Sequence, residues 1–380
     1  MKPRDRVLCA LNHEEPDRVP IFFGSSLPTS IHIQALQRLQ SYLGTTKPIN
    51  VLSRSYQMAL VDEELQILFH SDGRIIIPGP APSSLAKEIS ETAFMDEFGI
   101  AYEMRPGTIY YEMYFHPLRG KTADEIDNYP WPDLANPLRF RGLGAKARSL
   151  RRDSNFAIVG ESFCSIFEAC YMLRGMENWF MDLRKNLDWA HAVLRKITDL
   201  QISSAEGFLD EVGDSIDLIG MGDDLGSQNS TLISPDMYRK IIKPYHAQLI
   251  AAIKEKTKAK IVFHSDGNIY AILPDLIEIG VDLINPVQVS ARLMSDTARL
   301  KKDFGRRLSF CGGIDTQSVL PFGRPEDVRR EVRRRINDLA PGGGYICAAV
   351  HTIQPDVPPE NICALFDEAM KAGLYPINTT

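Results

Sequence analysis

The stretch that decides the fold lies in the second half of the chain and reads KIVFHSDGNIYAILPDLIEIGVDLINPVQ, from Lys260 to Gln288. Two apolar runs, Lys260–His264 and Val281–Val287, flank the segment Asn268–Glu278, whose apolar residues have helical spacing. A nearly continuous apolar run is typical of a parallel strand that is covered on both faces. The stretch therefore predicts a strand–helix–strand unit with a right-handed crossover.

The same alternation continues in both directions along the chain. Further strands are predicted at Phe156–Gly160, Ile216–Gly222, Leu308–Gly312 and Tyr345–Val350, and in the first half at Arg18–Gly24 and around Leu65–Phe69. Helix signals separate them; Ser234, for example, is an N-cap with Pro235 in the first turn. Eight strands with intervening helices predict an α/β fold, a distorted (β/α)₈ or TIM barrel. A doubly wound open sheet is the competing architecture, but no G-x-G-x-x-G follows a strand to support it.

One segment does not fit a barrel unit. Residues 87–132 contain a tyrosine-rich ribbon, Tyr110–Phe115, and a Tyr129–Pro132 turn. We expect this segment to be an insertion of β-structure and loops within a single domain of residues 1–380. The aromatic ribbon is suited to a wall over the substrate, a strand hairpin core or an interface, and it permits a homodimer.

Composition excludes several classes of function. The 380 residues include 43 Lys and Arg against 49 Asp and Glu, a net charge of −6, which argues against nucleic-acid binding and against a basic membrane anchor. No apolar stretch is long enough to span a bilayer, and no signal-peptide pattern follows Met1. The six cysteines have no C-x-x-C spacing. We therefore expect a cytoplasmic protein with reduced thiols.

Polar residues follow most of the predicted strands, where a barrel collects its chemistry. The candidates for acid, base or hydrogen-bonding roles in catalysis are Asp72, Glu161 and Asp224. The candidates for positioning substrate are Gln228, Asn285, Gln288 and Gln317. Asp, His, Asn, Gln and Cys dominate these positions and Lys is absent from them, which favours a catalytic pocket over ordinary surface loops.

Two histidines at different strand ends point to a metal. His264 and His351 would share one rim with Asp266, and a catalytic zinc uses three ligands from His, Cys and carboxylate while leaving one position open. Cys311 is a further candidate ligand. The rival interpretation is a metal-free acid–base site that uses the same groups.

Motifs along nearly the whole chain resemble the uroporphyrinogen decarboxylase superfamily. They are Lys2–Val7, Arg18–Pro20, Asp96–Gly99, Asp223–Gln228, Phe263–Gly267, Asn285–Gln288, Gly312–Gln317 and Pro355–Asn361. The resemblance implies a distorted (β/α)₈ barrel. It also implies two chemistries, cofactor-free decarboxylation of a tetrapyrrole and zinc-dependent methyl transfer involving a corrinoid.

The sequence departs from both branches. Where the decarboxylases carry an R-Q-A-G-R-Y motif that grips carboxylates, this chain has Gly24–Thr29 without arginine. In the methyltransferase branch the resemblance maps the zinc ligands onto His264, Asp266 and His351, so that Asp and His replace two cysteines. A harder ligand set favours a Lewis acid for oxygen or nitrogen over activation of a thiol.

The sequence therefore leads to three hypotheses. The first is a zinc enzyme that moves a methyl group from a small methoxy or methylamine-type donor to a corrinoid protein. The second is a metal-free decarboxylase of a small carboxylic acid or porphyrinogen, with Asp72 and His351 as acid–base groups, since the resemblance aligns both with decarboxylase residues. The third is a non-catalytic module that binds a corrinoid or tetrapyrrole.

Overall fold

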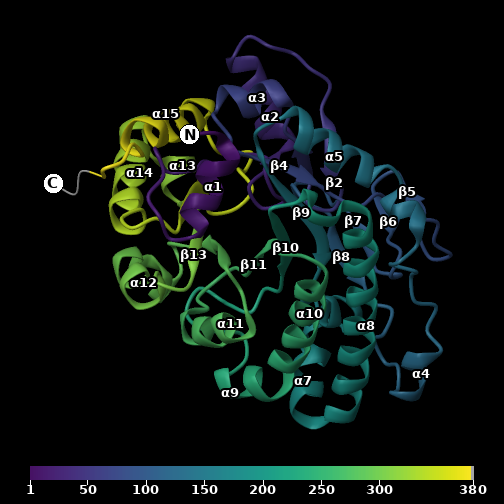
Figure 1. Cartoon of the computed structure of the whole chain (residues 1–380). Coiled ribbons are helices and arrows are strands. Elements are labelled where there is room, and N and C mark those ends of the chain that lie inside the picture. The colour runs from purple at the N-terminus through teal and green to yellow at the C-terminus, as the bar shows by residue number, and fades with distance from the viewer. Residues whose placement is uncertain (378–380) are drawn as a thin grey trace.

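The core of the fold is a curved, seven-stranded parallel sheet (Figure 1). The structure is a computed structural model and describes residues 1–377. Its strands are β4 (Gly73–Ile76), β9 (Ala157–Cys164), β10 (Leu218–Gly222), β11 (Lys260–His264), β12 (Leu283–Val287), β13 (Ser309–Ile314) and β14 (Tyr345–Ala349). They lie side by side in the order β14-β13-β12-β11-β10-β9-β4. Neighbours along most of this order are also consecutive in the chain, as repeated strand–helix units require.

The segment of residues 18–24 closes the barrel between the two edge strands. Phe22 N–H donates to the Cys347 carbonyl of β14 at 3.0 Å, and Asp72 N–H, at the start of β4, donates to the Ile21 carbonyl at 2.8 Å. The segment forms isolated bridges rather than a regular strand. The predicted distorted (β/α)₈ barrel is therefore confirmed, with this irregular segment in the eighth position.

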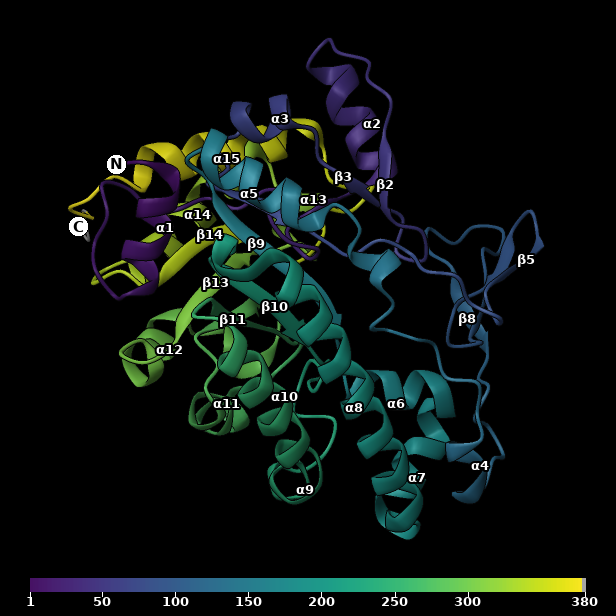
Figure 2. The same cartoon turned by 45° about the vertical axis from the view of Figure 1, so that its right-hand side comes forward.

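Helices such as α8, α10, α11, α12 and α14 cover the outside of the sheet (Figures 1 and 2). The helices of the chain are α1 (Pro3–Leu11), α2 (Ile33–Tyr42), α3 (Glu63–Leu68), α4 (Asp124–Asp127), α5 (Leu143–Asp153), α6 (Phe167–Arg174), α7 (Met176–Lys185), α8 (Leu187–Val212), α9 (Pro235–Met237), α10 (Lys243–Lys256), α11 (Leu273–Ile279), α12 (Thr297–Phe304), α13 (Val319–Phe322), α14 (Pro325–Leu339) and α15 (Pro359–Ala372). Within the described chain, none of these helices has both the length and the apolar character that crossing a membrane requires.

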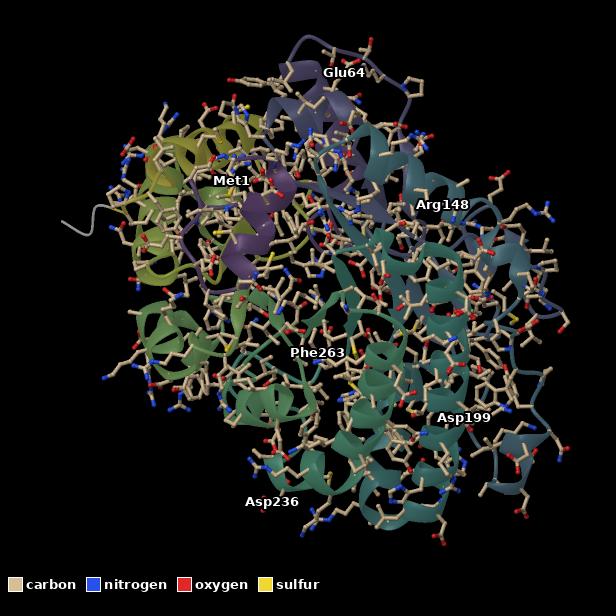
Figure 3. All side chains as sticks on the ribbon, in the orientation of Figure 1. Met1, Glu64, Arg148, Asp199, Asp236 and Phe263 are labelled. Atoms are coloured by element: carbon tan, nitrogen blue, oxygen red, sulfur yellow. The ribbon has the colours of Figure 1, made fainter. Side chains whose placement is uncertain are left out.

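The barrel interior is a packed core and not a channel. Its cluster takes side chains from six strands, from the closing segment and from α1: Val7, Leu11, Phe22, Ala157, Val159, Leu218, Val262, Leu283, Cys311, Ile346 and Ala348. A second, larger core lies between the sheet and its helices, where Phe263 is fully buried (Figure 3). Helix α1 packs against one end of the barrel, which leaves the opposite end for the site.

Two small antiparallel sheets lie to one side of the barrel (Figure 2). The first comprises β1 (Ile31–His32), β3 (Met58–Leu60) and β2 (Asn50–Ser53), in that order. The second comprises β5 (Lys87–Ser90), β6 (Ala93–Met95), β7 (Ala101–Glu103) and β8 (Glu112–Phe115). Both sheets contribute walls to the cavity described below.

The predicted strand around Leu65–Phe69 is wrong, because that segment is helix α3 with its C-cap. Asp62 caps the helix by accepting a hydrogen bond from Leu65 N–H at 3.1 Å. The apolar run that suggested a strand leaves Ile67 and Leu68 on the surface. The strand, β4, begins at Gly73, the last residue of the FHSDG motif, rather than before the motif.

Candidate active site

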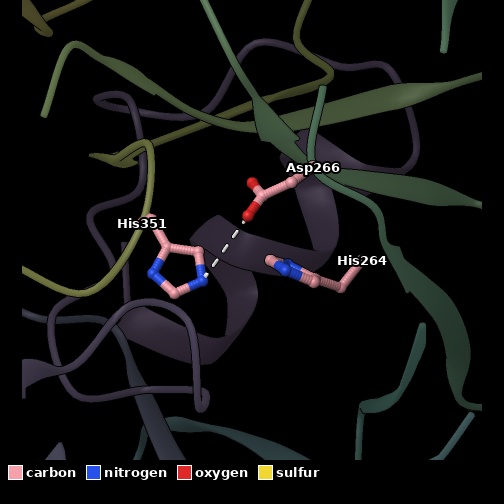
Figure 4. A group of neighbouring side chains, drawn as sticks. All are labelled: His264, Asp266 and His351. Atoms are coloured by element: carbon pink, nitrogen blue, oxygen red, sulfur yellow. Dashed lines mark ion pairs between the residues drawn. The ribbon is translucent and has the colours of Figure 1, made fainter. Parts of the chain in front are cut away.

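Three side chains that could bind a metal converge at the carboxyl ends of two strands (Figure 4). His264 is the last residue of β11, Asp266 follows two residues later, and His351 lies just beyond β14. One donor atom of each lies within 4.8 Å of the others. His351 Nε2 is 3.8 Å from Asp266 Oδ2, and the two imidazole rings have centroids 5.5 Å apart. The sequence prediction that these three residues lie together is thus matched by their geometry.

Two further predicted residues orient this group. His264 Nδ1 lies 2.7 Å from Asn285 Oδ1 on β12. Because the amide oxygen only accepts, it fixes the proton on Nδ1 and leaves Nε2 free to bind a metal. Asp224 accepts a hydrogen bond from Asp266 N–H at 2.8 Å and lies 4.0 Å from His264 Nε2.

Close backbone contact between the loops after β10 and β11 brings these groups together. A Cβ on Gly267, whose φ is +85°, would lie 2.4 Å from the Gly226 carbonyl carbon, and a Cβ on Gly226 would lie 2.5 Å from the Asp266 oxygen. Only glycine fits at both positions without a shift of backbone. This contact holds Asp224 beside Asp266.

The neighbouring carboxylate, Asp223, holds a helix instead. It is buried and accepts hydrogen bonds from the first amides of α6, including Phe167 N–H at 2.8 Å and Glu168 N–H at 2.7 Å. His246 Nε2 lies 2.6 Å from the same carboxylate. A carboxylate at a helix N-terminus satisfies orphan amides and complements the helix dipole. Asp223 thereby fixes where α6 begins and where Glu168 lies.

A cavity of about 400 Å³ opens beside the three candidate ligands. His264, His351 and Asp224 contribute to its floor, and Glu161 and Glu168 to its wall. The remaining wall is largely apolar and aromatic and includes Leu27, Pro28, Tyr56, Met58, Phe98, Ile100, Tyr102, Met172 and Leu173. Within the described residues 1–377, the lining contains no lysine and no arginine.

Burial perturbs two carboxyl groups in this wall. It raises the pKa of Glu161 to about 7, although a Leu27 N–H at 3.3 Å acts in the opposite direction. It also raises the pKa of Glu168 to about 8, an effect that the negative charges of Asp224 and Asp223 strengthen. Perturbed groups in a cleft are typical of functional sites. Near neutral pH these groups can therefore hold or release a proton.

The two histidines are shifted in opposite directions. Burial lowers the pKa of His264, but Asp266 and Asp224 outweigh it, so that the pKa rises overall. Burial lowers the pKa of His351, and the nearby His264 adds to that effect. Without a metal, His264 is therefore the more readily protonated of the pair, and His351 stays neutral.

Several sequence candidates lie elsewhere. Asp72 precedes β4, at the opposite end of the barrel, where it bonds Arg6 Nη1 at 2.6 Å and Arg18 Nη1 at 2.8 Å. The placement of Asp72 at the rim was therefore wrong, because the strand follows it. Cys311 is also displaced: β13 continues to Ile314, so the thiol points into the barrel core, where burial raises its pKa to about 12.

The glutamines do not reach the cavity. Gln288 accepts a hydrogen bond from Gly267 N–H at 2.5 Å and so supports the loop that carries Asp266. Gln228 and Gln317 are exposed in surface loops outside the cavity lining, because each lies several residues beyond its strand. No sequence pattern separates Gln288 from the other two, since all three follow strands.

Sequence reasoning missed Glu168 and the aromatic wall. Glu168 lies seven residues after Glu161, so the GESFCSIFE stretch carried the signal, but only the Asp223 contacts show that the helix begins there. Tyr56 and Tyr102 come from the two small sheets, whose placement over the barrel depends on tertiary packing.

The residues present fit a zinc-type metal. Two histidines and one carboxylate form the three-ligand set that leaves one position open, and Asn285 supplies the partner that metal-bound histidines usually have. Zinc–ligand bonds of about 2.0–2.1 Å require donor atoms roughly 3.4 Å apart, so modest side-chain movement would bring the three ligands together. Cys311 is not in this group.

A barrel whose cavity collects ionisable groups at the carboxyl ends of its strands defines a TIM-barrel protein of the enzyme type. The chain belongs to the uroporphyrinogen decarboxylase (URO-D) family, whose model matches residues 92–372. It is 25% identical over 388 aligned residues to a uroporphyrinogen decarboxylase of Xanthomonas euvesicatoria, covering 97% of this chain and 98% of that one. It is 26% identical over 263 residues to a uroporphyrinogen decarboxylase of Chloroherpeton thalassium, covering 67% of this chain and 69% of that one.

A solved structure shares the fold over nearly the full length. It is a methyltransferase from Methanosarcina mazei, with a TM-score of 0.68, 18% identity, and coverage of 98% of this chain and 99% of that chain. At this level of identity the likeness establishes the barrel and its connections.

Proposed function

We propose that this chain is a metal-dependent methyltransferase, which passes a methyl group from a small methylated donor to the corrinoid of a partner protein. The observation that carries the proposal is the group of His264, Asp266 and His351 beside a cavity without lysine or arginine. The full-length likeness to a methyltransferase structure supports it.

A bound zinc would act as a Lewis acid toward the donor atom that loses the methyl group. The chain's own residues orient the candidate ligands and shape the cavity. Asn285 orients His264, and Asp224 holds the loop of Asp266. The largely apolar wall excludes water from the cavity. The methyl carbon passes to the reduced corrinoid, and the leaving atom keeps the bonding electron pair.

A decarboxylase is the second candidate, because the family and the curated relatives carry that name. Two features weaken it. Asp72 is held by arginines at the far end of the barrel, so it cannot act with His351. The loop that carries arginines in decarboxylases supplies Ser26, Leu27 and Pro28 to this cavity. A polycarboxylate would enter a pocket whose ionisable lining groups are carboxyls, imidazoles and phenols.

The test combines metal analysis with methyl transfer. Purified protein should contain about one zinc per chain, and His264→Ala should lose both the zinc and the methyl-donor-dependent consumption of cob(I)alamin, followed by its absorbance. Metal-free protein that releases carbon dioxide from uroporphyrinogen would instead support the decarboxylase. Tight binding of cobalamin without any turnover would support a non-catalytic corrinoid-binding module.

A further inference from the structure

Four carboxyl groups line the cavity, but only two are available to a ligand. Asp96 accepts hydrogen bonds from Phe98 N–H and Ile100 N–H, both at 2.9 Å, and thereby stabilises a turn. Asp224 holds the Asp266 loop. The two carboxyls that remain are those of Glu161 and Glu168.

Glu161 is buried with little compensation. Its residue is 7% exposed, and Oε1 accepts one long hydrogen bond, from Leu27 N–H at 3.3 Å. Oε2 has no hydrogen-bond partner or ion pair within residues 1–377, and it lies against Gly220, where a Cβ would approach it to 2.1 Å. A buried carboxylate normally has a partner, because ionisation without one is costly. Here the open side of the carboxyl faces the cavity.

Glu168 reinforces this feature from a separate element. It lies in the first turn of α6, where the Asp223 carboxylate accepts hydrogen bonds from backbone N–H groups and so fixes the helix start. The Tyr171 hydroxyl is its side-chain partner, and no cation pairs with it in the part of the chain that the structure describes. Two acidic groups from β9 and α6 thus line one cavity, and neither forms an ion pair within residues 1–377.

The rest of the cavity lining is aromatic and apolar, which suits a ligand that combines a cationic group with a hydrocarbon body. The rings of Tyr56, Phe98 and Tyr102 border the same cavity, and aromatic faces attract cations. Met58 and Met172 add an apolar surface that could hold a hydrocarbon body. The candidate metal ligands His264 and His351 line the same cavity.

We propose that the methyl donor carries a cationic group, an ammonium, which Glu161 and Glu168 bind while the methylated end faces His264 and His351. This inference rests on the proposed function, since it names the donor of that reaction. The ligand's charge replaces the partner that the two carboxyls lack. An anionic donor would place like charges together, and a neutral donor would leave both carboxyls without a counter-charge.

The test uses three probes that share a methoxyphenyl body: 4-methoxybenzylamine, 4-methoxybenzyl alcohol and 4-methoxybenzoate. Binding to the full chain is measured by calorimetry slightly above neutral pH. The amine should bind roughly tenfold more tightly than the alcohol, as expected for a charge-assisted hydrogen bond. The benzoate should bind more weakly than either.

Matched variants and metal removal separate this inference from the proposed function. Glu161→Gln and Glu168→Gln should each reduce the preference for the amine severalfold, whereas Glu91→Gln, an exposed change in the β5–β6 turn, should retain it. The preference should persist in chelator-treated protein, because the carboxyls create it. Equal binding of amine and alcohol in folded protein, or a preference for benzoate, would overturn the inference; preference without methyl transfer would overturn only the proposed function.

Discussion

Replacing Glu161 by Gln should stabilise the protein, and the gain should grow as the pH rises. In the folded chain burial raises the pKa of this carboxyl from 4.5 to about 7. Between these two values the unfolded chain has released the proton and the folded chain still holds it. Stability therefore falls as the pH rises through this window. Glutamine keeps the size of the side chain and removes the titration.

The magnitude follows from the two pKa values. At about 1.4 kcal/mol per pH unit, the free energy of unfolding of the natural protein should lose roughly 3 kcal/mol from this group across the window. The free energy of unfolding of the variant should thus exceed that of the natural protein by almost nothing below pH 4.5 and by roughly 3 kcal/mol at and above about pH 7.

Urea denaturation from about pH 5 to about pH 8 measures this difference directly, because the contributions of all other titrating groups cancel between the two proteins. Glu91→Gln, exposed in a turn, provides the control and should show no growing difference. A Gln variant that is less stable than the natural protein at pH 8 would refute the reasoning, and so would a gain independent of pH. The first outcome would mean that Glu161 is ionised and paired in the folded chain, and the second that folding does not raise its pKa.

Three further predictions concern the other candidates. Asp72→Asn should destabilise the protein by about 3–5 kcal/mol, because it breaks a buried pairing with two arginines. It should leave the metal content of the folded protein unchanged. Urea denaturation measures the first effect and metal analysis the second. Cys311→Ala should also leave the metal content unchanged, since its thiol lies in the barrel core; loss of zinc would show that the thiol is a ligand. Asn285→Ala should weaken zinc affinity about 10- to 100-fold, measured by competition with a chelator, because His264 loses the acceptor that sets its proton; unchanged affinity would remove Asn285 from the site.

The second half of the barrel was predictable because its strands are buried on both faces and read as continuous apolar runs. The run Lys260–His264, for example, is β11 with the same bounds. The candidate ligands followed from it, since strand ends in a barrel meet at one rim. The motif FHSDG shows the limit. At Phe263–Gly267 it follows a strand, whereas at Phe69–Gly73 it follows a helix, so Asp266 and Asp72 lie at opposite ends.

What the sequence could not reveal depends on contacts between distant segments. The position of Cys311 depends on how far β13 continues, and Cys-Gly-Gly-Ile carries no clear signal of a strand end. The role of Glu168 depends on Asp223, which is distant in sequence. The aromatic wall depends on how the small sheets pack over the barrel mouth. Local patterns contain none of this information.

Two adjacent carboxylates just after β10 attach one part of the site to the barrel, whereas another part of the site has no such attachment. Asp223 anchors the helix of Glu168, and Asp224 anchors the loop of Asp266. One dipeptide thus ties the acidic wall to the candidate ligands, so neither can be altered without affecting the other. Within the described residues 1–377, the walls from residues 53–58 and 96–102 make no hydrogen bond to the barrel strands. We therefore expect substrate selectivity to vary through those two segments, while the candidate ligands stay on the barrel.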